Sequence, residues 1–586
     1  MKRRALGAAL LTALVVSLWC LTTGRTSLEA WRVPIDYSAD ALYTLATLRA
    51  AQDGHLTPTA QVTVPELGAP HGASWDGFLR QHKLQYVLAG LLARSSGLFP
   101  AANLLVLLAA VLSALSFQAM SRYFGARSEW AFAGACAFAL SPFFFHRSLS
   151  HLTLSFYWPI PLAILVVTWA FGRRGIVPGS RRFWAAALIV LAAGLHNIYY
   201  SALLAQFLGL ACVAHWLVRR SPRAALGTLA LIALLFAAVL ADNANLLFQR
   251  ASEGPTTSLL RPYGNLERYA LKPIELLLPI REGAIVPWRT AGASYLRQAL
   301  VRGEMGPVYL GLAGVVALLA LALAAARAAL RRPARPVPAA AWAVVWILAY
   351  SVVGGLNGLV GLSGFVWLRA TSRHSIWILA LVLLWAVVAM SRTALARRHG
   401  ASVLAATVAG ALTLADQLPP RTRAGAIREV SGRVASDGAF AGSLEKALPA
   451  GAMLFQLPVV DFPEGQRILA AADYEHLRPY LHAKRLRFSY GSDKGRARDA
   501  WQRRVESLEP EAMATALARM GFAGVVVNRK AYPDGAQALR EALAASGRLE
   551  VWESPDRDFL FIRLRPGPSP QPPDVVVPPS GESEGS

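Results

Sequence analysis

Residues 97–120 read GLFPAANLLVLLAAVLSALSFQAM, an apolar stretch that contains no Asp, Glu, Lys or Arg. A helix that spans a membrane needs about 20 predominantly apolar residues, so this stretch is long enough to cross. The whole chain of 586 residues is 55% hydrophobic and only 16% charged. Such a chain is too apolar for an ordinary soluble protein and too long for one domain. We therefore predict a polytopic α-helical membrane protein.

Other stretches have the same character, and together they give about eleven predicted transmembrane helices. They cover residues 5–23, 97–120, 129–145, 152–171, 183–195, 198–218, 224–241, 306–328, 338–356, 374–390 and 401–416. The fifth and the last two are short. An alternative for residues 183–218 is one broken helix with a polar centre at His196 and Asn197.

The positions of Lys and Arg predict the topology, since short loops rich in these residues stay cytoplasmic. Placing the N-terminal MKRR inside makes every other loop cytoplasmic, and each such loop contains a basic cluster. These clusters are Arg122 with Arg127, Arg173 with Arg174, Arg181 with Arg182, Arg219 with Arg220 and Arg223, the arginines of 327–335, and Arg392 with Arg397 and Arg398. The prediction is an N-in, C-out protein. Its formal charge of +24 follows largely from this pattern and does not indicate nucleic-acid binding.

The predicted outside portions are uneven in size. Residues 24–82 and 242–305 form long outer loops of the membrane domain (1–416), and 417–565 form an exported C-terminal domain. In that domain, apolar runs at 452–459, 522–529, 548–553 and 558–564 are separated by helix-like stretches at 510–521 and 535–546, which indicates an α/β fold. Residues 566–586 are rich in Pro and Ser and are predicted to be disordered. All three cysteines lie in predicted spans, so no disulfide is expected outside.

Ionisable residues gather at the predicted outer ends of the helices. Charge near a membrane usually faces a protein interior or an aqueous cavity, where it marks a site. One outer turn carries His146, Arg147 and His151, and the next carries His196, Asn197 and Tyr200. Interfacial anchoring is the plainer explanation for the aromatic residues. The three basic residues of the first turn, however, run against the tendency of such residues to stay inside.

The later outer segments add more basic residues. Residues 261–275 contain Arg261, Glu267 and Lys272, and the segment before the tenth predicted span contains Arg369 and Arg373. The planar guanidinium fork matches phosphate oxygens, and several arginines can share the charge of a diphosphate. A lipid phosphate is the expected partner. Ion pairing to local acids is the alternative.

Two carboxylates, Asp36 and Asp40, stand in the first outer loop, in IDYSADALYTL. If both lay on a helix, their spacing would place them on one face. Such a carboxylate could act as general base on a sugar hydroxyl, or hold a divalent cation such as Mg²⁺ or Mn²⁺. A helix cap or a turn is the simpler role for either Asp alone.

A Gly-bearing loop of the C-terminal domain, FSYGSDKGRARDAW, contains Tyr490, Asp493, Lys494 and Arg496. These side chains are suited to hold a glycan hydroxyl or a phosphate, although a solvated turn would look similar. Residues 473–480, DYEHLRPY, could join that surface or cap a helix.

At these residues the chain resembles the GT-C class of polyprenyl-phosphate-sugar-dependent membrane glycosyltransferases. More narrowly, it is similar to a bacterial group labelled membrane glycosyltransferase-like or sugar translocase proteins. The similar stretches are SADALYTL, ELGAPHGASWDGF, SLSHLTLSFYWPIPL, GLHNIYY, ERYALKPIELLLP, GEMGPVYLG, LRATSRHSIWI, LFQLPVVDFPE, DYEHLRPYL, LRFSYGSDKGR and GFAGVVVNRKAYPD.

The resemblance implies roles for particular residues. It makes Asp40 the best catalytic candidate and Asp76 a second acid, and it matches His151, Arg369 and Arg373 to polar and basic positions of the group. In that group the first-loop acid usually follows Gly, whereas Asp40 follows Ala39.

We therefore expect a glycosyltransferase of the bacterial inner membrane, with its C-terminal domain periplasmic. It would move a sugar from a polyprenyl-phosphate donor to a cell-envelope glycan or lipid. The sequence contains no Walker phosphate loop, no HExxH and no GxSxG motif, so the energy would come from an activated donor or a gradient. A lipid-linked saccharide flippase and a non-catalytic envelope assembly factor are the alternatives.

Overall fold

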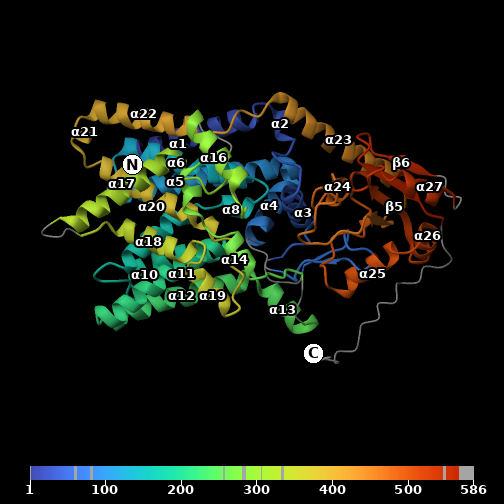
Figure 1. Cartoon of the computed structure of the whole chain (residues 1–586), viewed down its shortest axis with the longest axis horizontal. Coiled ribbons are helices and arrows are strands. Elements are labelled where there is room, and N and C mark those ends of the chain that lie inside the picture. Colours follow the sequence, from blue (N-terminus) through green and yellow to red (C-terminus); the bar gives the residue numbers. More distant parts are fainter. Residues whose placement is uncertain are drawn as a thin grey trace. The chain divides into compact units, whose positions relative to one another are not determined.

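The computed structural model describes residues 2–57, 62–78, 83–254, 258–279, 285–304, 306–331, 336–545 and 550–565 (Figure 1). The segment 566–586, predicted to be disordered, lies outside these residues. The chain folds into two compact units. Unit 1 comprises residues 1–30, 103–242 and 261–423, and unit 2 comprises residues 31–102, 243–260 and 424–586.

Unit 1 is built from helices (Figure 1). They are α1 (Lys2–Thr23), α5 (Leu98–Tyr123), α6 (Ser128–Ala139), α7 (Pro142–Arg147), α8 (Leu152–Ser155), α9 (Pro159–Ala170), α10 (Arg181–Gly194), α11 (Ile198–Val213), α12 (Pro222–Asp242), α14 (Gly264–Arg268), α15 (Pro273–Leu277), α16 (Val286–Gln298), α17 (Gly311–Leu330), α18 (Ala339–Ser351), α19 (Leu356–Leu362), α20 (Ser375–Met390), α21 (Ala394–Arg397) and α22 (His399–Gln417). A π-helical turn, η1 (Ala214–Val218), extends α11, and a 3-10 turn, η2 (Thr371–His374), leads into α20.

Among the described residues, six helices are long and apolar enough to cross a membrane. They lie at Ala5–Thr23, Leu98–Tyr123, Ile198–Val218, Pro222–Asp242, Gly311–Leu330 and Thr371–Met390, and two shorter apolar helices lie at Pro159–Ala170 and Ala339–Ser351. α20 is the most enclosed of the six, because α6, α9, α17 and α18 all pack against it. The positions of helices therefore follow the apolar stretches of the sequence, while the number of spans stays a prediction.

Prolines divide two of the predicted helices, and a third region forms two helices as predicted. The stretch 129–145 forms two helices, α6 and α7, because Pro142 lacks an N–H and occupies the first turn of a new helix. The stretch 152–171 likewise divides into α8 and α9, the latter beginning at Pro159. Residues 183–218 form two helices, and the side chain of Asn197 caps α11 by accepting a hydrogen bond from the Tyr199 amide. The single broken helix is therefore not formed.

Unit 2 contains a five-stranded mixed sheet in the order β4-β3-β5-β7-β6. Its strands are β3 (Met453–Leu457), β4 (Arg487–Phe488), β5 (Phe522–Asn528), β6 (Val551–Glu553) and β7 (Phe559–Arg563), with β3 parallel to β4 and β5, and β7 antiparallel to β5 and β6. The accompanying helices are α23 (Ala424–Ala447), α24 (Leu477–His482), α25 (Ala497–Glu506), α26 (Pro510–Arg519) and α27 (Gln537–Ala545), with a 3-10 turn, η3 (Arg529–Ala531). Phe455, Val525 and Ile562 of the sheet pack with Trp501 and Leu517 in one hydrophobic core.

The segment predicted as the first outer loop is largely structured and belongs to unit 2. It forms α3 (Asp40–Asp53) and a small hairpin of β1 (Thr63–Val64) and β2 (Ala73–Ser74), and it is followed by α4 (Lys83–Ser96). α3 and α4 approach closely at Gly90, where an added Cβ would lie 2.5 Å from the Ala51 backbone. Backbone bonds from Phe488 to Glu66 and from Ala69 to Phe488 cover the β4 edge of the sheet. α13 (Ala244–Glu253) and residues 258–260 complete the unit.

Candidate functional site

A buried ion-pair cluster in unit 1 joins three segments that are distant in sequence. Arg147, at the end of α7, donates from Nη2 to Glu304 Oε2 at 2.6 Å. Arg373, in η2, donates from Nε to the same oxygen at 3.0 Å, and its Nη2 donates to Oε1. Only 4% of the Arg147 side chain and about one sixth of the other two are exposed. We call Arg147, Glu304 and Arg373 the arginine cluster.

The arginine cluster has a net charge of +1, since two guanidinium groups face one carboxylate. Burial by itself would raise the pKa of Glu304, but Arg147 and Arg373 outweigh this effect and hold the pKa well below its usual range. Glu304 is therefore ionised. His151 lies beside the cluster, and burial together with the two arginines lowers the pKa of its imidazole to about 3. It is neutral at physiological pH and can donate or accept a hydrogen bond.

Aromatic side chains hold both guanidinium groups in place. Arg373 lies 4.6 Å from the centre of the Tyr199 ring, and Arg147 lies 5.5 Å from that of Phe143. The neighbouring Tyr200 is buried, and its hydroxyl donates to the Leu154 carbonyl at 2.7 Å. In the part of the chain that the structure describes, Arg147 Nε is buried and has no hydrogen-bond partner. The cluster is thus rigid and keeps a spare cationic donor.

The other basic residues predicted around this site have varied surroundings. Arg369 lies 4.9 Å from the centre of the Tyr269 ring, which belongs to the same unit. The Lys272 ammonium donates to the Arg268 carbonyl at 3.1 Å. Arg261 is half-buried and Glu267 is exposed on α14.

Three further polar residues at the predicted outer turns have local partners. His196 accepts a hydrogen bond from Trp158 Nε1 at 3.0 Å, and its Nδ1 lies 2.6 Å from the Ala192 carbonyl oxygen. Asn197 is buried as the cap of α11. His146 is half-buried and lies beside Gly306, where an added Cβ would be 3.2 Å from the imidazole ring. His196 and Asn197 therefore stabilise helix ends.

In unit 2, Asp40 is the first residue of α3 and is half-buried. The turn before it is closed by a hydrogen bond from the Ala41 amide to the Ser38 carbonyl at 3.0 Å. Ala39 has φ +43° and ψ −129°, a conformation that favours glycine and occurs at the first central position of a type II′ turn. The chain thus keeps a glycine-type turn before Asp40 although residue 39 is alanine.

The two acids of the first outer segment do not share a helical face. Asp36 precedes α3 and accepts a hydrogen bond from Ser38 Oγ at 2.7 Å. The condition for a shared helical face is not met, because α3 begins at Asp40 and the tight turn at Ala39 separates Asp36 from it. Asp36 instead fixes this turn.

A third acid, Asp473, was not identified from the sequence and is electrostatically coupled to Asp40. Burial and then the negative charge of Asp40 raise the pKa of Asp473 to about 7, against the lowering effect of the Tyr474 amide, which bonds to it at 2.8 Å. The rings of Tyr43 on α3 and Tyr474 lie 5.4 Å apart and hold the two segments together. The two carboxyl groups thus interact through charge, and the pKa of Asp473 lies near neutral pH.

The acid Asp76 is buried. Its Oδ2 accepts a hydrogen bond from the Val62 amide at 2.5 Å, which fixes the base of the β1-β2 hairpin. This contact favours a structural role for Asp76.

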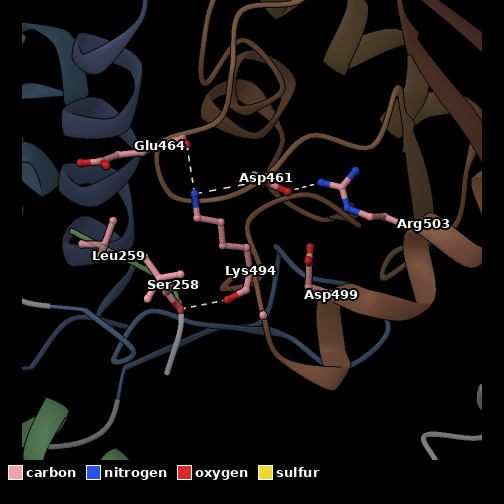
Figure 2. A pocket seen from close by; sticks show the side chains of 9 residues that line it. Ser258, Leu259, Asp461, Glu464, Lys494, Asp499 and Arg503 are labelled. Atoms are coloured by element: carbon pink, nitrogen blue, oxygen red, sulfur yellow. Dashed lines mark hydrogen bonds and ion pairs between the residues drawn. The ribbon is translucent and has the colours of Figure 1, made fainter. Parts of the chain in front are cut away.

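The Gly-bearing loop of unit 2 does not present its four predicted residues on one surface. Tyr490 is buried against Phe462 and His476. Asp493 accepts from the Gly77 amide at 2.9 Å, and Arg496 donates to the Glu253 carbonyl at 2.9 Å. Lys494 lines the cavity shown in Figure 2, and the other three do not line it. The loop is therefore packed into the interior of unit 2, with Tyr490 against Phe462.

Among the described residues, no group of three or more His, Cys, Asp or Glu side chains is arranged to hold a metal ion. The divalent cation considered for the first outer segment stays a prediction.

Sequence reasoning missed Glu304 and Asp473. Glu304 stands in GEMGPVYLG, one of the stretches that carries the family resemblance, but it is a single acid with no local partner in sequence. Asp473 begins DYEHLRPY, a stretch predicted to join the surface of the C-terminal domain or to cap a helix. Both acids lie within stretches that carry the family resemblance, and that position is the signal that could have identified them.

Comparison with solved structures shows what this fold resembles. The chain is similar to ArnT from Cupriavidus metallidurans bound to undecaprenyl phosphate, with a TM-score of 0.51 and 14% identity over 96% of this chain and 99% of ArnT. It is less similar to the mycobacterial arabinofuranosyltransferase AftD (TM-score 0.48, 16% identity, 97% of this chain and 42% of AftD). It is also less similar to the Archaeoglobus fulgidus oligosaccharyltransferase (0.42, 12%, 95% and 72%). No protein-family model and no curated protein matches the sequence. The likeness to ArnT shows a GT-C-like membrane fold, as the resemblance in sequence predicted.

Proposed function

We propose that the chain is an integral membrane glycosyltransferase that uses a polyprenyl-phosphate sugar as donor. The observation that carries this proposal is the buried arginine cluster, in which Arg147 and Arg373 exceed Glu304 by one positive charge. Burying unbalanced charge is costly, so such an arrangement is typical of a site for an anion. The GT-C-like fold supports the same conclusion at the level of architecture.

The charge of the arginine cluster suits the leaving group of this reaction. A polyprenyl-phosphate sugar is a phosphodiester with one negative charge, and breaking its glycosidic C–O bond releases a phosphate monoester with a second charge. Preorganised cations stabilise charge that develops in the transition state. We assign Arg147 and Arg373 to the donor phosphate, with neutral His151 as a further hydrogen-bonding group and Arg369 as an additional cation.

The acceptor hydroxyl must lose a proton as it attacks the anomeric carbon. We assign this proton to Asp40, the general base on α3. Asp40 holds this proton after the transfer. The new glycosidic bond replaces the bond to phosphate, so atoms and charge balance without an oxidant or reductant.

The donor and acceptor are proposed from chemistry and by analogy. ArnT was solved with undecaprenyl phosphate, and a lipid-linked phosphate of this kind would suit a buried site in a membrane protein. We propose that the acceptor is a cell-envelope glycan or lipid and that transfer occurs at the outer face of the bacterial inner membrane, with unit 2 outside.

The test uses the full chain purified in lipid nanodiscs with a panel of labelled undecaprenyl-phosphate sugars. The measured quantity is the release of undecaprenyl phosphate by the wild type, by Asp40→Asn and by Asp53→Asn. Asp53 is the matched control, because it lies on the same helix and pairs with Arg49 near the surface. We expect release by the wild type and by the control, and a loss of at least 100-fold for Asp40→Asn.

Two results would contradict the proposal. Turnover by Asp40→Asn at the wild-type rate would remove Asp40 from the mechanism. No release by the wild type from any donor would favour a flippase or an assembly factor instead.

A further inference from the structure

Unit 2 contains a cavity of about 340 Å³ between the segment after α13, the loop after β3 and the start of α25. Figure 2 shows the charged side chains that line it, among them Asp461, Lys494, Asp499 and Arg503. Leu259 and Leu260 supply an apolar part of the wall. The volume lies in the range of roughly 300–1,000 Å³ that is common for small-ligand sites.

Asp499 distinguishes this cavity from an ordinary charged surface. The residue is only 6% exposed, and Figure 2 shows its carboxylate pointing from the start of α25 into the cavity. Within the described residues its carboxylate has no hydrogen-bond partner, and its neighbours act on it only through charge. The Asp499 carboxylate therefore offers unused accepting capacity to whatever occupies the cavity.

The other polar groups of the cavity are held in place by one another. The Lys494 ammonium donates to the Glu464 carbonyl at 3.2 Å and lies 4.0 Å from Asp461 Oδ2, while Asp461 Oδ1 accepts from Arg503 (Figure 2). Ser258 Oγ donates to the Lys494 carbonyl at 3.1 Å, which links the segment after α13 to the loop. These contacts hold Lys494, Asp461 and Arg503 in place around the cavity.

The balance of charges indicates the class of ligand. Two carboxylates, Asp461 and Asp499, accompany two cations, Lys494 and Arg503, so a phosphate would meet as much negative as positive charge. An apolar ligand would leave Asp499 without a partner. A hydroxyl group both donates and accepts, and a ring carrying several hydroxyls presents C–H surface to Leu259 and Leu260 as well.

We propose that this cavity binds a saccharide unit of the glycan acceptor, with the Asp499 carboxylate accepting hydrogen bonds from its hydroxyl groups and Lys494 and Arg503 donating to them. The assignment to the acceptor rests on the proposed glycosyl transfer, whereas saccharide binding itself does not. The other source of a saccharide is the sugar of the donor.

The protonation of Asp499 gives the binding a pH dependence. Burial is the main effect on this carboxyl, followed by the lowering influence of Arg503, the raising influence of Asp461 and the lowering influence of Lys494, and the resulting pKa is about 6. Glu464 is the remaining titratable group of the lining. Above pH 7 Asp499 is an acceptor, and below pH 5 it is protonated.

The experiment measures binding of methyl glycosides to the full chain in lipid nanodiscs by saturation-transfer NMR and calorimetry. The probes are methyl glycosides of neutral hexoses and pentoses, their disaccharides and their 2-amino analogues. We expect at least one probe to bind the wild type at pH 7.5, with a Kd at least tenfold higher in Asp499→Asn and at pH 5. Glu511→Gln, which removes an exposed carboxylate of α26, should bind as the wild type does.

Two further measurements distinguish a loss of saccharide binding from a loss of folding. Thermal unfolding shows whether Asp499→Asn is folded, and Arg503→Gln, at a side chain that is half exposed, should weaken binding without affecting the fold. Absence of binding by every probe, or equal binding by wild type and Asp499→Asn, would overturn the inference. If glycosides bind but no donor is turned over, the saccharide site stands and the proposed transfer fails. If Asp499→Asn weakens donor binding instead, the cavity serves the donor sugar and the acceptor assignment is wrong.

Discussion

Replacing Arg373 tests the arginine cluster most directly, because two substitutions separate the effect of its charge from the effect of its hydrogen-bond geometry. Arg373→Met removes the charge and keeps a long side chain, so the net charge of the cluster falls from +1 to zero. Arg373→Lys keeps the charge but cannot reproduce the two bonds that Nε and Nη2 make to Glu304.

The expected magnitudes follow from these contacts. A hydrogen bond to a charged group contributes about 1.5–3 kcal/mol, and a unit charge about 4 Å from a phosphate contributes roughly 4 kcal/mol at an effective dielectric constant of 20. If Arg373→Met loses about 3–4 kcal/mol of transition-state stabilisation, kcat/KM falls roughly 10²- to 10³-fold. Arg373→Lys loses about 1.5 kcal/mol, which corresponds to about tenfold.

The assay follows release of undecaprenyl phosphate from the donor that the wild type uses, in nanodiscs, over a range of donor concentrations. Arg433→Met is the matched control, since Arg433 is a partly exposed residue of α23 that pairs with Glu429 one turn away. We expect the order wild type and control, then Arg373→Lys, then Arg373→Met. Folded Arg373→Met protein with kcat/KM within twofold of wild type would refute the assignment of the cluster to the donor phosphate.

Three further predictions concern unit 2. Asp473 binds its proton more tightly in the folded state, with a pKa of about 7, so its contribution to stability should fall as pH rises from about 4 to about 7. Asp473→Asn should flatten that part of a plot of Tm against pH. An unchanged plot would contradict the raised pKa. Arg478 is buried and bonds to the fully buried Asp437 at 2.9 Å, so Arg478→Met should cost about 3–5 kcal/mol, measured as a lower Tm. Ala39→Gly should raise Tm. Relief of about 1–2 kcal/mol of backbone strain at φ +43° in the folded state exceeds the roughly 0.4–1 kcal/mol by which glycine stabilises the unfolded chain through added conformational entropy. A lower Tm would mean that the turn is unstrained.

Much of the helical architecture could be predicted because it depends on local chemistry. Apolar stretches such as 97–120 must form helices to satisfy their backbone in a membrane, and helix α5 lies at Leu98–Tyr123. The four strands β3, β5, β6 and β7 fall within the apolar runs that were read as strands. The prediction of one helix over residues 129–145 is wrong, because a new helix begins at Pro142. A proline in the interior of an apolar stretch is the signal that predicts such a division.

The candidate sites could be predicted only in part because their geometry depends on distant residues. Arg147 and Arg373 were identified as cations, but the carboxylate that joins them, Glu304, is separated from them by 157 and 69 positions. Likewise the first outer segment gave no sign that it would complete unit 2 by covering the two-residue strand β4. Asp499 was not considered, since in sequence it is one charge among several in an arginine-rich helix.

The wide separation of Arg147 and Glu304 in sequence also affects the order in which the protein is assembled during synthesis. Arg147 leaves the ribosome 157 residues ahead of its carboxylate partner, which at about 5–20 residues per second is a delay of roughly 8–30 s. During that interval the guanidinium has no counter-ion for a buried position, so α7 cannot reach its final packing. Arg373 arrives later still, and the arginine cluster therefore closes only after η2 has been made. The region around the arginine cluster therefore cannot reach its final packing before translation has passed residue 373.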